Sequence, residues 1–168
     1  ERTHTYKCPV ISTNTQLNQK LELLNEIGSI SKTGGWEVDL ASGVITWTDE
    51  MFRIYGLPHG SPVSISTAMA YFPPETKKAI TASFDKVVRE GKEYCHEGFL
   101  RRADGKVLRI KATGKPRYTG KKVTQVFGAL EDITEQYRLL ETEYNYAAYL
   151  TAILDNLNDV VVTIDTSG

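Results

Sequence analysis

Histidine and cysteine supply most nucleophilic and metal-binding sites, and this chain has few of either. Its three histidines are His4 in a leading tail, His59 in a loop with Pro and Gly, and His96 in an alternating segment. A nucleophile needs an adjacent base, and no Ser-His-Asp or Cys-His arrangement can be recognised around them. His4 and Cys8 form a lone pair, and two ligands do not close a zinc site. We therefore expect no catalytic residue and no metal site, so any enzyme would lie elsewhere in a longer polypeptide.

A basic stretch over residues 101–122 contains nine Lys or Arg and a single acid, Asp104. Nucleic-acid binding would interleave aromatic side chains or a groove-reading helix with this charge, whereas here the basic residues fall on strand faces and turn tips. Residues 114–122 resemble a phosphate loop only superficially, because the spacing is one residue too long and no Ser or Thr follows the Gly-Lys. We interpret the stretch as a solvated sheet face and expect no nucleic-acid partner.

Composition indicates an ordinary globular module. The 168 residues are 40% hydrophobic and 24% charged, enough for one domain-sized core plus extra helices. The net charge of −1 predicts no bulk attraction to nucleic acid or anionic lipid. No apolar run approaches the ~18 residues of a membrane span, so we expect no direct membrane insertion, and no signal peptide opens the chain. The two cysteines are too few for a disulfide framework, which favours the reducing environment of the cytoplasm. We therefore expect a cytoplasmic protein or the cytoplasmic part of a membrane-anchored one.

The elements that would position any site are clearest over residues 93–134, which predict three short strands joined by two tight turns. The turns are residues 103–105, with an Asp-Gly pair, and residues 119–121, with a central glycine. Glycine accepts the positive φ that such turns need without steric cost. The last strand ends in Glu131-Asp132-Ile133-Thr134 and leads at once into a charged helix.

Upstream segments follow a compatible order. Residues 36–40 and 44–47 predict a hairpin around the turn 41–43, and residues 48–57 predict a short helix with Thr48 as N-cap and Gly56 at its end. A further helix runs from about Glu75 to a stop at Gly91. In order and spacing, residues 33–135 resemble a PAS domain of the PAS fold-3 type with its PAC-like segment, from a multidomain bacterial-type signalling protein. This resemblance implies an α+β fold: a five-stranded antiparallel sheet with helices on one face.

The domain organisation follows from these boundaries. We expect a disordered leader over 1–12, an N-terminal amphipathic helix over 13–32, the PAS domain over 33–134, and a coiled-coil linker helix over 135–158. Residues 152–168 repeat the order helix end, apolar strand and an Asp shortly before a Gly that is found around the first strand and its turn, so 159–168 resemble the first strand of a truncated second PAS domain, with Val160–Ile164 as the strand. Such an apolar strand without partners must stay disordered, pair with another chain or dock on the first domain.

The linker helix carries an apolar seam at alternating four- and three-residue steps, as in a coiled coil. Its members are Ile133, Tyr137, Leu140, Tyr144, Ala147, Thr151 and Leu154. The alternative is that either flanking helix packs on its own sheet, because the period alone does not separate the two cases.

Strand alternation assigns the sheet faces. Residues 108, 110, 112 and 114 should face the core together with 126, 128 and 130, which leaves Val123, Phe127 and Ala129 on the outer face with Phe99. Because exposed apolar patches often mark interaction sites, we expect a flanking helix or a second subunit to pack against this outer face. We therefore predict a homodimer. The candidate interface residues are Leu17, Leu21, Leu24, Phe99, Val123, Phe127, Tyr137, Leu140 and Tyr144.

A ligand pocket is expected inside the domain, from the family layout and the alternation. The candidates are Trp47, Phe52, Tyr55, His96, Leu108, Ile110, Val126 and Leu130. His96 could line a small space opened by Gly98, or it could be a core histidine satisfied by backbone or water. Flavin-binding PAS domains carry a reactive Cys in a helix and haem-binding ones a His near the central helix, yet this chain has no Cys over 9–94 and no His over 75–91. Haem and flavin are thus disfavoured, and an unknown small ligand remains.

The resemblance implies a sensory or dimerisation module for intracellular signal transduction. It would relay the state of a ligand or neighbouring domain through the C-terminal helix to a distant output domain on the same polypeptide, of histidine kinase (two-component) or diguanylate cyclase type. Asp132 and Thr134 are the candidate relay residues, because their short side chains can bond backbone groups where strand becomes helix. Two alternatives are a structural dimerising spacer without ligand and a cofactor-binding photo- or redox sensor.

Overall fold

The computed structural model describes the backbone of residues 13–165 and the side chains of residues 15–154. The chain divides into two compact units, of which the first ends at Asp132 and the second begins at Ile133. The expected leader over 1–12, with His4 and Cys8, lies outside the described residues.

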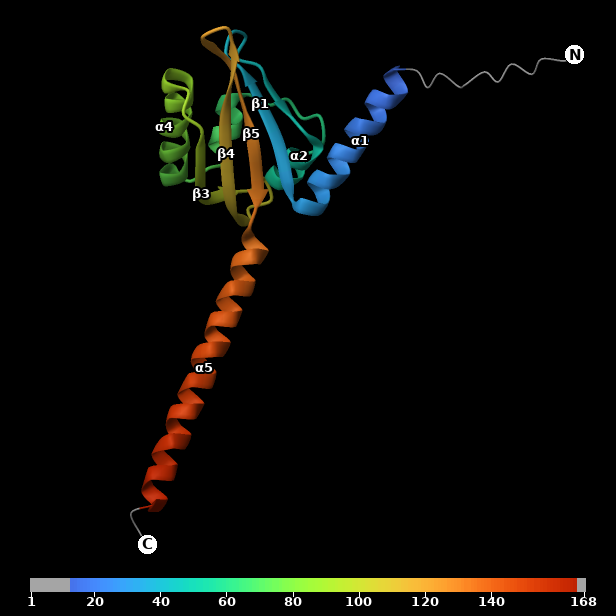
Figure 1. Cartoon of the computed structure of the whole chain (residues 1–168). Helices are drawn as coiled ribbons and strands as arrows, with labels where there is room; N and C mark the ends of the chain where they lie inside the picture. Colours follow the sequence, from blue (N-terminus) through green and yellow to red (C-terminus); the bar gives the residue numbers. More distant parts are fainter. Residues whose placement is uncertain (1–12, 166–168) are drawn as a thin grey trace, which may run out of the picture. The chain divides into compact units, whose positions relative to one another are not determined.

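The first unit is built on a five-stranded antiparallel sheet, which confirms the predicted fold class. The strands β1, β5, β4 and β3 lie side by side in Figure 1, and the full order is β2-β1-β5-β4-β3. The first long strand is therefore paired with the last one, which places β5 at the centre of the sheet. The bounds are β1 Thr33–Asp39, β2 Ile45–Trp47, β3 Tyr94–Arg101, β4 Val107–Thr119 and β5 Lys122–Asp132.

The turns between the strands use the predicted residues. Gly43, Gly105 and Gly120 have φ values of 70°, 86° and 64°, in the left-handed region that glycine tolerates. The carboxylate of Asp39 accepts hydrogen bonds from the backbone N–H and the hydroxyl of Ser42, both at 2.8 Å. These bonds lower the pKa of Asp39 and hold the first hairpin closed.

Four helices belong to the first unit: α1 Thr13–Ser31, α2 Asp49–Tyr55, α3 Ile65–Ala70 and α4 Pro74–Glu90. Helix α2 begins after Thr48 and ends at the left-handed Gly56, as predicted. The Thr48 hydroxyl, however, accepts a hydrogen bond from the backbone N–H of Gly35 on β1 at 2.9 Å and makes no cap bond to the helix. Thr48 thus ties the start of α2 to the sheet.

The alternation predicted for β4 is confirmed, because residues 108, 110, 112 and 114 are all buried. On β5 the buried residues are Val126 and Leu130, on the predicted inner face. The core of the first unit lies between this face and the helices. Its main buried cluster includes Met51, Ile54, Tyr55, Ala68, Phe72, Ile80, Leu100, Leu108, Ile110, Ala112 and Leu130.

The predicted outer-face position of Val123 is wrong. A register shift lies between Arg117 and Tyr118: Arg117 pairs with Gln125, whereas Tyr118 pairs with Val123. The extra residue on β5 is a β-bulge, and directly paired residues on antiparallel strands share a face. Val123 therefore lies on the face of Tyr118, whose hydroxyl donates to the carbonyl of Gly91 at the end of α4. Alternation cannot locate a bulge, so the sequence pattern missed it.

The second unit is one helix, α5, Thr134–Asp165. The strand predicted at residues 160–164 is wrong, because this segment is part of α5. A single strand without a neighbour leaves its backbone groups without a ladder, whereas a helix satisfies them within the segment. The helix consequently extends past the predicted end of the linker at residue 158.

Candidate functional site

A cavity between the sheet and its helices, partly open to solvent, is the candidate site. Its volume is about 70 Å³, counted as the space open to the centre of a water-sized sphere. All five strands contribute to its wall, together with α2, α3, α4 and the segment between α3 and α4. The lining residues are Trp36, Val38, Ile45, Trp47, Met51, Tyr55, Ile65, Ala68, Met69, Phe72, Ile80, Phe84, Tyr94, Ala112 and Leu130.

Three of the eight predicted pocket residues line this cavity: Trp47, Tyr55 and Leu130. Four others are buried in the core away from it, namely Phe52, Leu108, Ile110 and Val126. His96 is half-buried on β3, opposite Ala112, and does not line the cavity. Alternation identified the correct face of each strand. It could not say where along the strand the covering helices leave space.

The lining residues of α3 and of the segment after it were not predicted. Ile65, Ala68 and Met69 of α3 and Phe72 beyond its end are spaced i, i+3, i+4 and i+7, the pattern of one helical face. Ser64 precedes them, and its hydroxyl accepts from the backbone N–H of Thr67 at 3.0 Å as an N-cap. This spacing and cap were the signals that would have identified the helix.

No space opens at Gly98, contrary to the suggestion from the sequence. A Cβ at Gly98 would lie 2.7 Å from the side chain of Thr76, so this threonine of α4 occupies the room. The Thr76 hydroxyl also accepts a hydrogen bond from the backbone N–H of Phe99 at 3.1 Å. Thr76 is 5% exposed and anchors α4 to the edge strand β3. The glycine is needed for this close approach and opens no pocket for His96.

Aromatic rings pack around one end of the cavity. The centroid of Trp47 lies 4.5 Å from that of Tyr55 and 5.3 Å from that of Phe52. Tyr55 also contacts Tyr71 edge-on at 5.3 Å. Such offset and edge-on pairs add to the energy of burial and fix the orientation of each ring. The wall on this side is therefore shaped by rigid side chains.

Polar atoms are scarce in the wall of the cavity. Burial raises the pKa of the Tyr55 and Tyr94 phenols, because desolvation disfavours their ionised forms. Both phenols are thus neutral near pH 7 and can donate a hydrogen bond. The indole Nε1 of Trp47 is buried and has no hydrogen-bond partner among the described residues. A buried N–H without an acceptor is uncommon in folded proteins.

The outer face of the sheet carries the predicted aromatic residues beneath arginines. Phe99 is 47% exposed, and the guanidinium of Arg109 lies 5.8 Å from the centre of its ring. Arg109 also forms an ion pair with Glu97 at 3.7 Å. The apolar ring is therefore partly covered from within the same chain.

The same arrangement recurs on β5 and β1. The guanidinium of Arg117 lies 4.7 Å from the ring centre of Phe127 and 2.6 Å from a carboxylate oxygen of Glu37. Lys115 forms a further ion pair with Glu93 at 2.8 Å. Three of the nine basic residues counted over residues 101–122, Arg109, Lys115 and Arg117, are therefore paired with acids from neighbouring segments. This pairing agrees with the interpretation of a solvated sheet face.

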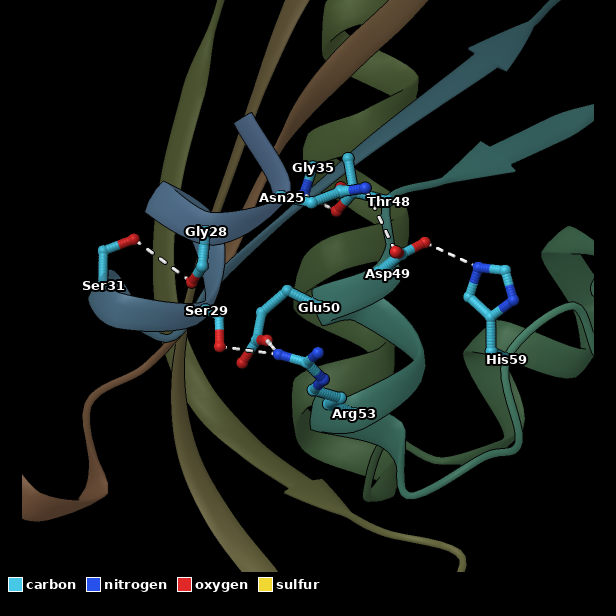
Figure 2. Close-up of polar contacts among 10 residues, drawn as sticks. All are labelled: Asn25, Gly28, Ser29, Ser31, Gly35, Thr48, Asp49, Glu50, Arg53 and His59. Atoms are coloured by element: carbon cyan, nitrogen blue, oxygen red, sulfur yellow. Dashed lines mark hydrogen bonds and ion pairs between the residues drawn. The ribbon is translucent and has the colours of Figure 1, made fainter. Parts of the chain in front are cut away.

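A polar junction joins the end of α1 to α2 (Figure 2). The Asn25 amide donates to Asp49 at 3.1 Å, and the Arg53 guanidinium donates to the hydroxyl of Ser29 at 2.6 Å. The ring of His59 approaches the other carboxylate oxygen of Asp49 at 2.6 Å. These contacts fix the C-terminal end of α1 on the domain.

Glu50 is the buried acid of this junction, at 7% exposure. Desolvation raises its pKa, although the guanidinium of Arg53 at 3.1 Å acts in the opposite direction. The charge of Asp132, at the end of β5, raises the pKa of Glu50 further. The backbone N–H of Asp132 donates to the carbonyl of Lys32 at 3.0 Å, so the end of β5 is tied to the segment that follows α1.

The relay candidates bracket the change from strand to helix. Asp132 is the last residue of β5 and Thr134 the first of α5. The backbone N–H of Tyr137 donates to the carbonyl of Ile133 at 3.2 Å and opens the helix. Ile133 therefore stands at the N-cap position, with a polar residue on each side.

The predicted interface residues differ in exposure. Leu17, Leu21 and Leu24 on α1 are 54%, 50% and 62% exposed. On α5, Leu140 and Tyr144 are exposed and Tyr137 is half-buried. On the sheet, Phe99 is exposed and Phe127 half-buried.

Comparison with known families decides what kind of domain this is. The family model described as PAS fold matches residues 44–130, just over half of the chain. The chain belongs to the PAS family. The PAS domain is a sensory, non-catalytic fold, which agrees with the histidine and cysteine arrangement in the sequence. The strands β2 to β5 and the helices α2 to α4 all fall within or overlap the matched residues.

Solved structures show the same fold at low sequence identity. A sensory box histidine kinase/response regulator from Burkholderia thailandensis E264 matches with a TM-score of 0.58 and 17% identity, over 77% of this chain and 98% of that one. The N-terminal domain of a diguanylate cyclase with PAS/PAC sensor from Marinobacter aquaeolei gives 0.57 and 16%, over 62% and 98%. An RNA-binding light-oxygen-voltage receptor gives 0.60 and 19% over 73% of this chain, which spans about a third (34%) of the receptor. No curated protein matches the chain.

Among the residues that the structure describes, no group of three or more His, Cys, Asp or Glu side chains comes together as a metal site would require. Within the same part of the chain, no helix combines the length and the apolar character needed to cross a bilayer.

Proposed function

We propose that this PAS domain is a cytoplasmic sensory and dimerisation module that relays the state of a ligand, or of a neighbouring domain, through α5 to an output domain on the same polypeptide. The main support for this proposal is that the central strand β5 leads directly into the helix α5. Strand β5 ends at Asp132 and α5 begins at Thr134, with only Ile133 between them. Because β5 is the central strand and α5 follows it after a single residue, a shift of the sheet would be passed along the backbone to the start of the helix.

The cavity between the sheet and its helices supports the sensing half of this proposal. It lies beside β5, because Leu130 belongs to its wall, two residues before Asp132. A molecule that fills the cavity would contact the helices and the central strand together. Differential binding to two arrangements of these elements is what a ligand needs to shift their populations. The neighbours from a histidine kinase and a diguanylate cyclase make such proteins the proposed source of the output domain.

Exposed apolar side chains on both flanking helices support the dimerisation half. Three leucines of α1 and the part of the α5 seam from Leu140 onward are open to solvent in the single chain, for instance Leu24 at 62% and Tyr144 at 76%. Helices with an uncovered apolar stripe are stabilised by packing against a partner. We place a second copy of the chain there.

The relay is tested at the junction, in the full-length protein with its output domain. Asp132→Ala and Thr134→Ala should each leave the sheet folded by circular dichroism and change the output about two- to thirtyfold, since losing a side-chain bond to the backbone at a helix start, worth ~0.5–2 kcal/mol, shifts a balanced equilibrium by that factor. Thr142→Ala is the matched control. Its hydroxyl donates to the carbonyl of Arg138 within α5, so the change removes a similar bond away from the junction. Unchanged output with an intact fold in both junction variants would make this connection passive.

A structural spacer without ligand and a cofactor-binding sensor are the alternatives. Native mass spectrometry of the purified chain tests the first, because a sensor of small molecules should retain or take up a compound and a spacer should not. Visible absorbance tests the second: we expect no flavin or haem bands, and their presence would replace the conformational proposal with a photo- or redox-sensing one.

A further inference from the structure

The C-terminal end of α1 docks on the start of α2 through side-chain hydrogen bonds. The amide of Asn25 donates to Asp49 at 3.1 Å, and the hydroxyl of Ser29 accepts from Arg53 at 2.6 Å (Figure 2). Asn25 and Ser29 are four residues apart, so they lie on one face of the helix. Residues 15–24, which precede these contacts, are all exposed. The contacts therefore hold α1 at its C-terminal end.

Gly28 brings the backbone of α1 close to the start of β1. A Cβ at this position would lie 2.9 Å from the carbonyl oxygen of Thr33 and 3.7 Å from the Cβ of Glu50 on α2. Glycine in the interior of a helix is unfavourable relative to alanine, and it is used where two backbones approach closely. The docked position of α1 therefore depends on a residue without a side chain.

Lys32 alone joins α1 to β1, because α1 ends at Ser31 and β1 begins at Thr33. The φ of Lys32 is 52°, in the left-handed region that is costly for a residue with a Cβ. Such a conformation persists where the surrounding contacts enforce it. Because no other residue separates helix from strand, a change in the angle of α1 has to be absorbed at Lys32.

The same residue holds the end of the central strand. The carbonyl of Lys32 accepts a hydrogen bond from the backbone N–H of Asp132 at 3.0 Å, and the next pair along the two strands is Thr33 with Glu131. Asp132 is the last residue of β5, and α5 begins at Thr134. Hydrogen bonds weaken steeply when their angle is distorted. A rotation of the peptide group after Lys32 would therefore weaken this bond just before α5.

We propose that α1 is a second input of the domain: its docking on α2 sets the conformation of Lys32, and the hydrogen bond from Asp132 to Lys32 passes the docked or undocked state of α1 to the start of α5. This inference deepens the proposed relay and rests on it for the response of an output domain. The input acts on the exposed apolar side of α1, where a second copy of the chain is proposed to pack. The route requires no ligand in the cavity.

Two variants undock α1 without weakening the helix itself. Gly28→Ala places a Cβ against the carbonyl of Thr33, and the double variant Asn25→Ala/Ser29→Ala removes the two hydrogen bonds to α2. Alanine favours the helix at all three positions. His59→Ala is the matched control, because it removes a contact of Asp49 that comes from outside α1.

Hydrogen exchange of single backbone N–H groups, followed by NMR on the whole chain, measures the coupling. The N–H of Asp132 should exchange ~5- to 50-fold faster in both undocking variants, as expected when a hydrogen bond opens locally. The N–H of Leu40 is the internal reference, because it donates to the carbonyl of Thr124 at 3.0 Å beyond the opposite end of β1. Its rate should stay within about twofold in every variant, and both rates should do so in His59→Ala.

Two exchange results would overturn the coupling. One is an unchanged rate at Asp132 in both undocking variants, with shifted α1 signals showing that the helix has moved. The other is an equal rise at Asp132 and Leu40, which would show that the variants loosen the whole domain.

The full-length protein with its output domain separates the input from the relay. Gly28→Ala should change the output in the same direction as the double variant, and His59→Ala should leave it unchanged. Unchanged output in Gly28→Ala, together with changed output in Asp132→Ala, would overturn α1 as an input and leave the relay through α5 intact. Unchanged output in both junction variants would instead overturn the relay itself.

Discussion

The two faces of the sheet are made by the same strands and are used in opposite ways. On the inner face of β4, Leu108, Ile110 and Ala112 are buried against the helices. The alternate residues Arg109 and Lys111 point to the other side, where arginines lie over Phe99 and Phe127 and pair with acids. The inner face thus carries the buried apolar side chains of the sheet, and the outer face carries solvated pairs.

This difference indicates on which face of the sheet side chains can be substituted without unfolding the domain. Burial of one large apolar side chain contributes ~1.5–3 kcal/mol, whereas an exposed ion pair contributes ~0–1 kcal/mol. Inner-face residues are therefore constrained by stability as well as by any ligand. Outer-face residues are free to serve assembly.

The largest expected effect compares two neighbours on β4. Ile110 is 0% exposed, so Ile110→Ala should lower the free energy of unfolding by ~2–5 kcal/mol through lost burial and a cavity. Arg109→Ala, one residue away on the outer face, should cost ~1 kcal/mol or less. Urea denaturation of both variants measures the contrast. Similar losses for the two would show that the faces are not energetically distinct.

A smaller effect concerns assembly on the exposed surfaces. We expect a homodimer at micromolar concentration, and Phe99→Ala should weaken association about 5- to 30-fold if its ring lies in the interface, with little change in the stability of the monomer. Truncation after Gln136 should weaken association more if α5 is the main contact. Multi-angle light scattering across a dilution series reports both. A monomer mass at high concentration would contradict the dimer.

The smallest effect concerns the charged exception to the apolar interior, Glu50. Desolvation raises the pKa of Glu50 in the folded state, so its carboxyl group binds a proton more tightly in the folded than in the unfolded chain. The contribution of Glu50 to the free energy of unfolding therefore falls as the pH rises from the ordinary pKa of 4.5 toward the raised pKa. Glu50→Gln should therefore gain stability relative to the natural chain between pH 4 and pH 7. Urea denaturation at several pH values gives the difference. A constant difference across this range would show that Glu50 titrates as in the unfolded chain.

Much of the fold could be predicted from local pattern. Turn glycines such as Gly105 and Gly120, the stop at Gly91 and the alternation around Ile110 each reflect a constraint within a few residues of sequence. Local constraints of this kind are visible in composition and spacing. The order of the segments then indicated the PAS fold, which the family match and the sheet topology confirm.

The candidate site was predicted less well, because a cavity is a property of several elements at once. Trp47, Tyr55 and Leu130 were predicted to line the cavity and do so, whereas the α3 residues and Tyr94 were not predicted. His96 was predicted as a pocket residue but does not line the cavity. The Thr76 side chain that fills the space at Gly98 comes from a helix 22 residues earlier in the chain. No periodicity on β3 could have indicated it.

By itself, the sequence determined most of the strands and helices between residues 33 and 134, the apolar side of most strand positions, and that no catalytic arrangement is evident. The tertiary structure alone decided where the cavity lies, that a bulge turns Val123 to the face of Tyr118, and that residues 160–164 are helical. The reason is physical. Backbone preference and hydrophobic period act over a few residues, whereas packing, register and the satisfaction of backbone hydrogen bonds depend on neighbours distant in the sequence.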